Sequence, residues 1–323
     1  MKQQTVFNEI RTRCRAVANQ ARHVHIAAER IPEYIAPLLV QTLDVPTIEA
    51  TSHFVGENEP TIAFFTTLAA VNFGSGYFPH LNKRPGMSGY YTIATALTEH
   101  FRSRGAFTAV ELSQITSVDC ASLFSQDGSD PVIGELMSLF AQAWNDLGGS
   151  LSAKYDGQFT TLIEAAEHSA GKLVELMADQ PLFRDVSHYH GINVPFYKRS
   201  QLLASDLSLA LKGKGLGHFE DLDQLTIFAD NLVPHVLRLD GILQYEPTLL
   251  NRIEAEQLIP AGSDEEIEIR ACCIHAVELM IQAAAEVGVH WTARDVDQVL
   301  WHQGQHPRYK QQNKRHRTRT VFY

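Results

Sequence analysis

The sequence lacks the features by which membrane, secreted and cysteine-rich proteins are recognised. No apolar run approaches the ~18 residues needed to cross a bilayer. The first residues (MKQQTVFNEI) contain neither the apolar stretch nor the small-residue cleavage site of a signal peptide. The four cysteines form no CxxC pair, so neither a disulfide framework nor a cysteine zinc site is indicated. We therefore expect a soluble cytoplasmic protein with no membrane partner.

The charge of the chain is unevenly distributed. The net charge is −10, and hydrophobic residues make up 45% of the 323 residues, which is ordinary for a folded protein. An acidic surface repels phosphate backbones, so we expect no stable complex with nucleic acid, and a small nucleotide is favoured over a polynucleotide. Residues 308–320 break this trend, because they include several Lys and Arg and no acid. This segment fits either a solvated basic tail or a local anion site.

Apolar residues recur at helical spacing along most of the chain. Near the N-terminus, Phe7, Ile10, Cys14, Val17 and Ala21 lie three or four residues apart, which places them on one face of a helix. Further helices are predicted over residues 31–43, 90–101, 157–179, 196–211, 263–287 and 292–304. Residues 61–73 are apolar almost all round, which predicts a buried helix. These spacings indicate an all-α fold.

Capping and turn signals mark the boundaries of these helices. The pattern at 108–111 has the spacing of a capping box, and Asp130 precedes a proline at the first helical position. Residues 74–88 form a loop rich in Gly, Pro, Ser and Asn. Residues 186–194 alternate around a central glycine and are the one β-hairpin that we expect. A single compact multi-helix domain over residues 1–323 is the simplest prediction, with two lobes around a cleft as its variant.

Three patterns suggest ligand binding but have simpler explanations. The glycine cluster at 213–217 resembles a phosphate loop, yet it follows a helix, so a helix C-cap and turn is favoured. His302 and His306 have the spacing of metal ligands on a helix, but no third ligand stands at a recognised spacing. We therefore predict no metal. His188 and His190 alternate on the predicted hairpin and are expected to be partly exposed.

Two segments combine polar and apolar residues in an unusual way. Residues 196–203 (FYKRSQLL) carry Tyr197 and Lys198 into an apolar helix. Residues 225–234 (LTIFADNLVP) place Asp230 after an apolar run and four residues before a proline, which a regular helix does not continue through. On spacing alone, helix N-capping explains Asp230 at least as well as catalysis does.

Both segments resemble signature blocks of the queuosine salvage protein family, the queuosine 5′-phosphate N-glycosylase/hydrolases. The resembling blocks are FYKRSQLLASDL and LTIFADNLVPHVL. Further similar blocks stand in the family's order at residues 51–60, 71–73, 89–91, 266–279, 297–301 and 316–323. The resemblance therefore covers nearly the whole chain, and it rests on the number and order of the blocks.

The resemblance implies an all-α fold similar to that of helical DNA glycosylases, acting on a free nucleotide and needing no cofactor. Members release queuine, a 7-deazaguanine base, from queuosine 5′-monophosphate by hydrolysis, and a separate enzyme inserts queuine into tRNA. Asp230 matches the family's catalytic carboxylate. His53, Phe228 and Asp297 match positions of the base pocket.

The residue types suit this reaction. Cleavage of an N-glycoside develops positive charge on the ribose, and a desolvated Asp230 can stabilise that charge or polarise the attacking water. Lys198 can keep Asp230 ionised, orient it or hold the ribose, and the sequence leaves these roles open. Asp297 suits the N–H donors of a guanine-like edge. Arg317, Arg319 and Lys198 are the candidates for the 5′-phosphate.

Four more residues complete the predicted substrate-binding set: Asn72, Tyr197, Gln298 and His302. The last two depart from the family's pattern, because Gln298 replaces a tyrosine and His302 replaces a second aspartate. The loss of that carboxylate leaves the preferred base open. The alternatives are an N-glycosidase for another deazapurine nucleotide, such as a queuosine precursor, a non-catalytic nucleotide-binding protein, and a helical interaction scaffold. The sequence does not fix the oligomeric state.

Overall fold

The computed structural model describes residues 5–39, 47–310 and 314–323. Helices predominate, and the strands of the described residues form two short antiparallel pairs, which confirms the predicted all-α class. None of the described helices is long and apolar enough to cross a membrane. The chain divides into two compact units. Unit 1 contains residues 1–46, 185–198 and 223–319, and unit 2 contains residues 47–184, 199–222 and 320–323.

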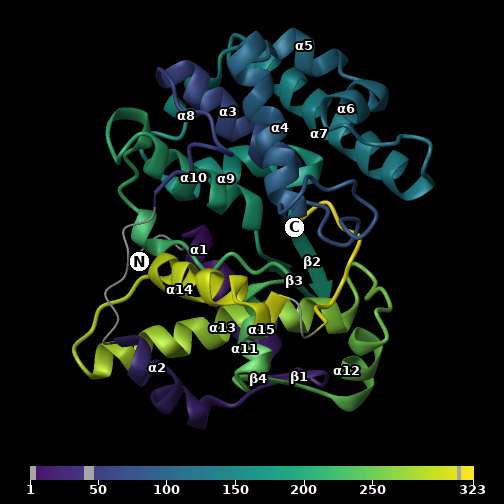
Figure 1. The fold of residues 1–323 in the computed structure, drawn as a ribbon. Helices are drawn as coiled ribbons and strands as arrows, with labels where there is room; N and C mark the ends of the chain where they lie inside the picture. The colour runs from purple at the N-terminus through teal and green to yellow at the C-terminus, as the bar shows by residue number, and fades with distance from the viewer. Residues whose placement is uncertain (1–4, 40–46, 311–313) are drawn as a thin grey trace. The chain divides into compact units, whose positions relative to one another are not determined.

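Unit 1 is built around the long helix α13 (Asp264–Glu286), shown in Figure 1. Its other helices are α1 (Val6–Ala18), α2 (Ile31–Leu39), α11 (Val233–Leu239), α12 (Pro247–Glu254), α14 (Ala293–Gln305), α15 (Pro307–Lys310) and the short 3-10 helix η1 (Ala28–Arg30). The first half of α13 is buried on nearly every side, since α1, α2, α11 and α14 all pack against it. Residues carried by α13 therefore lie in the core of unit 1.

Two strand pairs also belong to unit 1. Strands β2 (Val186–Tyr189) and β3 (Ile192–Pro195) form the predicted hairpin. Its turn has positive φ angles at His190 (45°) and Gly191 (89°), as in the two-residue turns that suit twisted hairpins. The pair of β1 (Val24–Ile26) and β4 (Leu243–Tyr245) was not predicted, because each strand has three residues and the two are distant in sequence.

Unit 2 surrounds helix α7 (Pro131–Lys154), which packs against four other helices of the unit. The remaining elements are α3 (Asn58–Val71), α4 (Gly89–Arg104), α5 (Ala109–Gln114), α6 (Ser117–Leu123), α8 (Phe159–Glu164), α9 (Ala170–Ala178), α10 (Lys198–Ala210), η2 (Pro181–Phe183) and η3 (Gly215–Gly217), while η4 (Leu222–Gln224) joins the two units along the chain. Helix α3 is buried all round, as its sequence predicts. The indole of Trp144 on α7 donates to the carbonyl of Thr67 on α3 at 2.9 Å.

Most of the predicted boundaries are confirmed. Thr108 forms a complete capping box at the start of α5. Asp130 accepts from two backbone N–H groups at the start of α7. Residues 74–88 form a loop without regular structure. The glycine cluster at 213–217 follows α10 and continues into a 3-10 turn, so the C-cap and turn interpretation is confirmed.

Other predicted helices are shorter than expected. The stretch 157–179 is divided into α8 and α9, because Glu167 (φ 49°) and His168 (φ 61°) adopt the left-handed conformation, which ends a right-handed helix. Helix α1 ends at Ala18, so Ala21 lies outside it. Helix α2 is described to Leu39, and its predicted extension to residue 43 lies outside the described residues.

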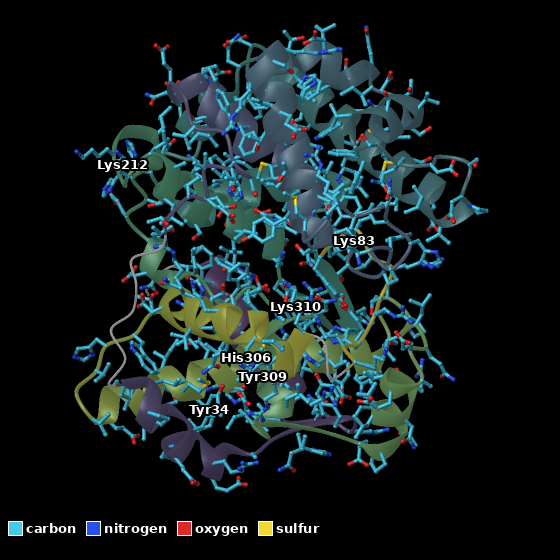
Figure 2. All side chains as sticks on the ribbon, in the orientation of Figure 1. Tyr34, Lys83, Lys212, His306, Tyr309 and Lys310 are labelled. Atoms are coloured by element: carbon cyan, nitrogen blue, oxygen red, sulfur yellow. The ribbon has the colours of Figure 1, made fainter. Side chains whose placement is uncertain are left out.

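One carboxylate, Asp240, connects three helices of unit 1. The hydroxyl of Tyr34 on α2 donates to its Oδ2 at 2.9 Å, and that of Tyr309 on α15 donates to its Oδ1 at 2.8 Å. Both tyrosines are labelled in Figure 2. Arg308 adds an ion pair at 3.4 Å. Asp240 ends α11, so these contacts fasten the helix that follows the Asp230 segment.

Candidate functional site

Asp230 lies in unit 1, directly before α11. Its Oδ1 accepts hydrogen bonds from the backbone N–H of Leu232 at 2.7 Å and of Val233 at 3.3 Å. Asp230 thus stands just before a helix start, as predicted, with Pro234 in the first turn of α11. The N-cap residue of this helix is Leu232, however, so the N-cap interpretation of Asp230 is wrong. Its Oδ2 accepts no hydrogen bond from the residues that the structure describes, and the side chain is partly exposed. One oxygen is thus fixed by the backbone, while the other is available to a ligand.

Asp297 and Phe228 lie in the same neighbourhood as Asp230. Cys273 projects from α13, where burial raises the pKa of its thiol, and the nearby charges of Asp230 and Asp297 raise this pKa further. Asp297 on α14 also accepts a hydrogen bond from the backbone N–H of Phe228 at 3.4 Å. Both predicted carboxylates therefore lie within electrostatic range of the buried Cys273 thiol, and Asp297 contacts the backbone of the predicted aromatic residue Phe228.

A cation from the C-terminal segment lies within electrostatic range of Asp230. Burial lowers the pKa of Arg315, and the negative charge of Asp230 opposes this shift, so the two side chains lie within electrostatic range. Arg315 forms no hydrogen bond or ion pair with the part of the chain that the structure describes. A half-buried guanidinium near a carboxylate is well suited to an anionic ligand.

The C-terminal segment packs into the fold at residues 314–323. His316 is 2% exposed and Thr318 is fully buried, so the interpretation of the segment as a solvated tail is wrong from His316 onward, whereas Lys314 is exposed. Arg317 forms a β-bridge with Leu258, and its Nη2 donates to the carbonyl oxygen of Glu256. Arg319 is partly buried.

Lys198 is the first residue of α10, and its side chain is buried. Its backbone N–H donates to Oδ2 of Asp185 at 3.1 Å. Tyr197 directly before it has a φ of 48°, in the left-handed region that a bulky residue rarely adopts. A conformation of this kind persists only where its surroundings hold it in place.

The remaining predicted residues of unit 1 lie on α14. Gln298 is partly buried, whereas His302 is exposed, with its ring edge-on to Trp301 at a centroid distance of 5.4 Å. His306 follows the last residue of this helix and is exposed. Among the described residues, no group of three His, Cys, Asp or Glu side chains could hold a metal ion. His188 and His190 of the hairpin are exposed, as predicted.

His53 belongs to unit 2, where it lies against aromatic side chains. Its Nε2 is 2.7 Å from the hydroxyl of Tyr90, and its Nδ1 is 3.1 Å from the carbonyl oxygen of Glu49. The imidazole stacks on Phe65 at a centroid distance of 6.0 Å. Burial lowers the pKa of His53, although the contacts with Glu49 oppose the shift. The ring is therefore neutral at pH 7, which suits contact with an uncharged base.

Asn72 also belongs to unit 2 and forms the C-cap of α3. The carbonyl groups of Ala69 and Ala70, in the same turn, accept from Nη1 of Arg199 at 3.0 and 2.7 Å. The guanidinium of Arg199 also stacks on Phe183 at 4.2 Å. Arg199 is thus a structural residue, which holds the end of α3 and so the backbone that carries Asn72.

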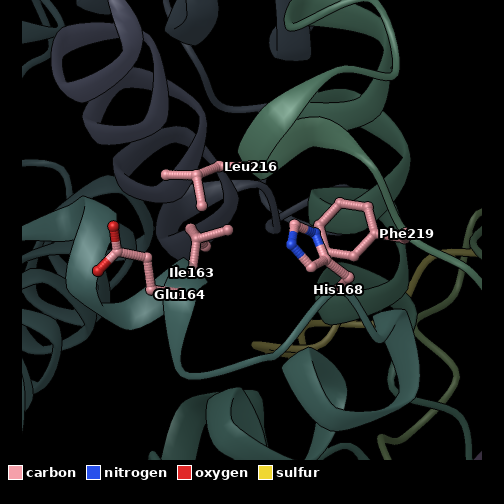
Figure 3. Close-up of a pocket in the computed structure, with 5 residues that line it drawn as sticks. All are labelled: Ile163, Glu164, His168, Leu216 and Phe219. Carbon is pink, nitrogen blue, oxygen red and sulfur yellow. The ribbon is translucent and has the colours of Figure 1, made fainter.

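A small surface pocket of about 100 Å³ lies in unit 2 (Figure 3). Its lining residues are Ile163, Glu164, His168, Leu216 and Phe219. None of the predicted site residues lines it. Its His168 ring is already bonded to the backbone of its own unit, at 3.0 Å from a carbonyl oxygen. We assign this pocket no part in the site.

Comparison with known proteins shows to which family the ordered sequence blocks of this chain belong. The sequence model of the family described as "Queuosine salvage protein" matches residues 52–323. The chain is also 36% identical to a queuosine 5′-phosphate N-glycosylase/hydrolase of Sphaerobacter thermophilus over 97% of both chains. This chain belongs to the queuosine salvage protein family. A protein of the same printed name from Dictyostelium discoideum is 35% identical over 67% of this chain and 66% of its own.

The comparisons thus confirm the family that was predicted from the ordered sequence blocks. Two residues within electrostatic range of Asp230 were not predicted as part of its surroundings. Arg315 was counted among the cations of the C-terminal segment without being singled out, and Cys273 was considered only as a possible disulfide or metal ligand. Both are far from Asp230 in sequence, so no local spacing could place them beside it. A signal did exist for Arg315, because it directly precedes the matching block at 316–323.

Proposed function

We propose that this chain hydrolyses the N-glycosidic bond of queuosine 5′-phosphate and releases the base queuine. Its membership of the queuosine salvage family and the printed name of its relatives support this activity. The observation that carries the proposal is the Asp230 carboxylate, with Oδ1 fixed by backbone N–H groups and Oδ2 available. The four cysteines are buried and unpaired with one another, which is consistent with a cytoplasmic enzyme.

In this proposal Asp230 acts on the sugar. The bond between C1′ and the base nitrogen breaks, water supplies a hydroxyl group to C1′, and the base leaves with a proton. Positive charge develops on the ribose during this step, and the carboxylate stabilises it or polarises the water. Asp230 suits this role because its orientation is set before the substrate binds, and preorganised charge is the effective kind.

In this proposal, other predicted residues recognise the nucleotide. Asp297 accepts N–H groups of the guanine-like edge, and Phe228 contacts the base. Lys198 orients Asp230 or holds the ribose. The 5′-phosphate needs a cation, and Arg315 joins Arg319 as a candidate because its guanidinium lies near Asp230.

The other residues of the predicted substrate-binding set complete the proposal. Arg317 is a weaker candidate for phosphate, since Glu256 already binds its guanidinium. Gln298 and His302 remain the residues that set the choice of base, and His53, Asn72 and Tyr197 the further contacts. An N-glycosidase for another deazapurine nucleotide stays the second candidate, because a glutamine and a histidine stand where the family has tyrosine and aspartate.

A substrate panel tests this function. The protein is incubated with queuosine 5′-phosphate, the unphosphorylated nucleoside, precursor nucleotides and queuosine-containing tRNA, and the released base is resolved by chromatography. We expect release from queuosine 5′-phosphate, far less from the nucleoside, and none from tRNA, because the acidic surface disfavours polynucleotides. Preferential release from a precursor would support the second candidate. No release from any of them would contradict an enzymatic function.

A further inference from the structure

A buried ion pair in unit 1 links α13 to the segment before α10. Arg270 on α13 is 0% exposed, and its Nη1 and Nη2 donate to Oδ1 and Oδ2 of Asp185 at 2.8 and 2.7 Å. Glu266, one turn earlier on α13, lies 3.7 Å from Nη1. The guanidinium also lies 4.0 Å from the centroid of the Phe196 ring. This fork-to-fork geometry fixes both side chains in one orientation.

Each partner of this pair also holds the backbone beside a proposed catalytic residue. Nε of Arg270 donates to the carbonyl oxygen of Ala229 at 3.2 Å, in the peptide group that links Ala229 to Asp230. Oδ2 of Asp185 accepts the backbone N–H of Lys198 at 3.1 Å. The backbone carbonyl of Asp185 accepts from Phe196 at 2.9 Å, in the turn before Lys198.

Stability alone does not explain such a pair. Removing two charges from water costs about as much as their attraction returns, so a buried pair is often replaceable by apolar residues without loss of stability. An apolar replacement would, however, supply no directional bonds to the backbone at Asp230 and Lys198. The pair therefore serves orientation.

We propose that Arg270 and Asp185 are positioning residues for the hydrolysis, which hold the backbones of Asp230 and Lys198 at a fixed separation. This inference rests on the proposed function, because it assigns the pair a role in that reaction. It also explains the left-handed Tyr197, whose backbone N–H donates to the same carbonyl of Asp185 at 3.4 Å. Neither residue touches the substrate in this account, and both act through the loops that they hold.

The chain offers a matched control on the same helix. Glu268 is also 0% exposed, and its Oε2 accepts three backbone N–H groups, from Arg22, His23 and Val24, at 2.6 to 3.1 Å. Its Oε1 accepts the Tyr189 hydroxyl at 2.9 Å. Glu268 thus also fastens backbone to α13, but it contacts neither the Asp230 loop nor the turn at Lys198.

The experiment compares Asp185→Asn and Arg270→Lys with Glu268→Gln in the full-length protein. For each variant, kcat and KM are measured on queuosine 5′-phosphate, and the free energy of unfolding is measured by urea denaturation. Arg270→Lys keeps the charge but loses the fork, so it provides a second test should Asp185→Asn fail to fold. We expect both site variants to lower kcat by about 10- to 100-fold with KM changed far less, since displacements on the order of 1 Å have effects of that size.

Glu268→Gln should lose a similar amount of stability while kcat stays within about twofold of wild type, because its contacts lie away from the reacting groups. Wild-type kcat in a folded Asp185→Asn or Arg270→Lys variant would overturn the positioning role and leave the proposed function intact. An equal loss of kcat in all three variants would overturn it too, since the effect would then follow stability. If the wild-type protein itself releases no base, the proposed function fails, and this role fails with it.

Discussion

Asp230 uses one carboxylate oxygen for the backbone of α11 and leaves the other for a ligand. The sequence presented N-capping and catalysis as competing explanations, but the N-cap of α11 is Leu232, and only Oδ1 of Asp230 accepts backbone N–H groups. A carboxylate that its own backbone holds in one orientation is suited to stabilising a cationic ribose, so these hydrogen bonds and the proposed chemistry are compatible.

His235 provides a residue-scale prediction about stability. Nδ1 of its ring lies 3.3 Å from Nη2 of Arg238, which only donates, so Nδ1 must accept and Nε2 must donate to the carbonyl of Tyr309 at 2.8 Å. The ring is therefore neutral, and burial lowers the pKa of His235 from 6.5 to about 4. Below pH 6.5, His235 binds a proton in the unfolded chain but stays unprotonated in the folded chain until the pH approaches 4. The free energy of unfolding therefore keeps its full value above pH 6.5 and decreases as the pH falls below it.

Between pH 7 and pH 5, we expect His235 to remove about 2 kcal/mol from the free energy of unfolding. Urea denaturation at several pH values measures this slope. His235→Gln should flatten it, whereas His290→Gln, at an exposed position, should not. His316 is buried as well, and its pKa is lowered to about 3, so it adds a slope of the same sign that remains in the His235 variant. An unchanged slope in His235→Gln would contradict the buried neutral histidine.

At the scale of elements, the helices with complete sequence signals were predicted well. Thr108 and Asp130 both cap the helices that their patterns predict, and α3 is buried all round. The division of 157–179 was missed because its apolar periodicity continues across the break. Two residues with positive φ end the helix there, and neither Glu167 nor His168 is a glycine, the residue type that marks such a turn most clearly.

Two adjacent glycines of α7 give an element-scale prediction. A Cβ on Gly148 would lie 2.5 Å from the carbonyl oxygen of Ala109 and from the backbone nitrogen of Ser113 in or next to α5, so the helices touch through their backbones there. A Cβ on Gly149 would meet nothing within 4 Å. We expect Gly148→Ala to lower the free energy of unfolding by about 1–3 kcal/mol, because the two helices must separate.

Gly149→Ala should instead raise the free energy of unfolding by up to about 1 kcal/mol, since alanine favours the helix and fills open space. Thermal or urea denaturation of the two variants gives the comparison directly. Equal effects of the two substitutions would show that α5 and α7 do not pack as closely as described.

At the scale of the whole molecule, the family and the helical class could be inferred from sequence, while the site geometry could not. Ordered blocks along the chain identified the family because many weak matches add up. They could not show that Arg315 lies within electrostatic range of Asp230, or that Arg270 bonds both to the backbone before Asp230 and to Asp185, because these residues meet only in the folded chain. Gln298 and His302 stand out in the sequence, but the choice of base depends on how they meet a ligand.

The central claim is that Asp230 catalyses the release of the base, and a pair of substitutions tests it. Asp130 makes the same pair of hydrogen bonds before α7, where its Oδ1 accepts the backbone N–H of Val132 at 2.8 Å and of Ile133 at 3.0 Å. Asp230→Asn and Asp130→Asn should therefore cost similar stability, on the order of 1 kcal/mol each. The measurement is the rate of queuine release from queuosine 5′-phosphate in single-turnover conditions.

We predict that Asp230→Asn lowers this rate by about 10²- to 10⁴-fold, the range for loss of a catalytic acid–base or charge-stabilising group. Asp130→Asn should keep the wild-type rate. Release by Asp230→Asn at the wild-type rate, with the protein folded, would contradict the account.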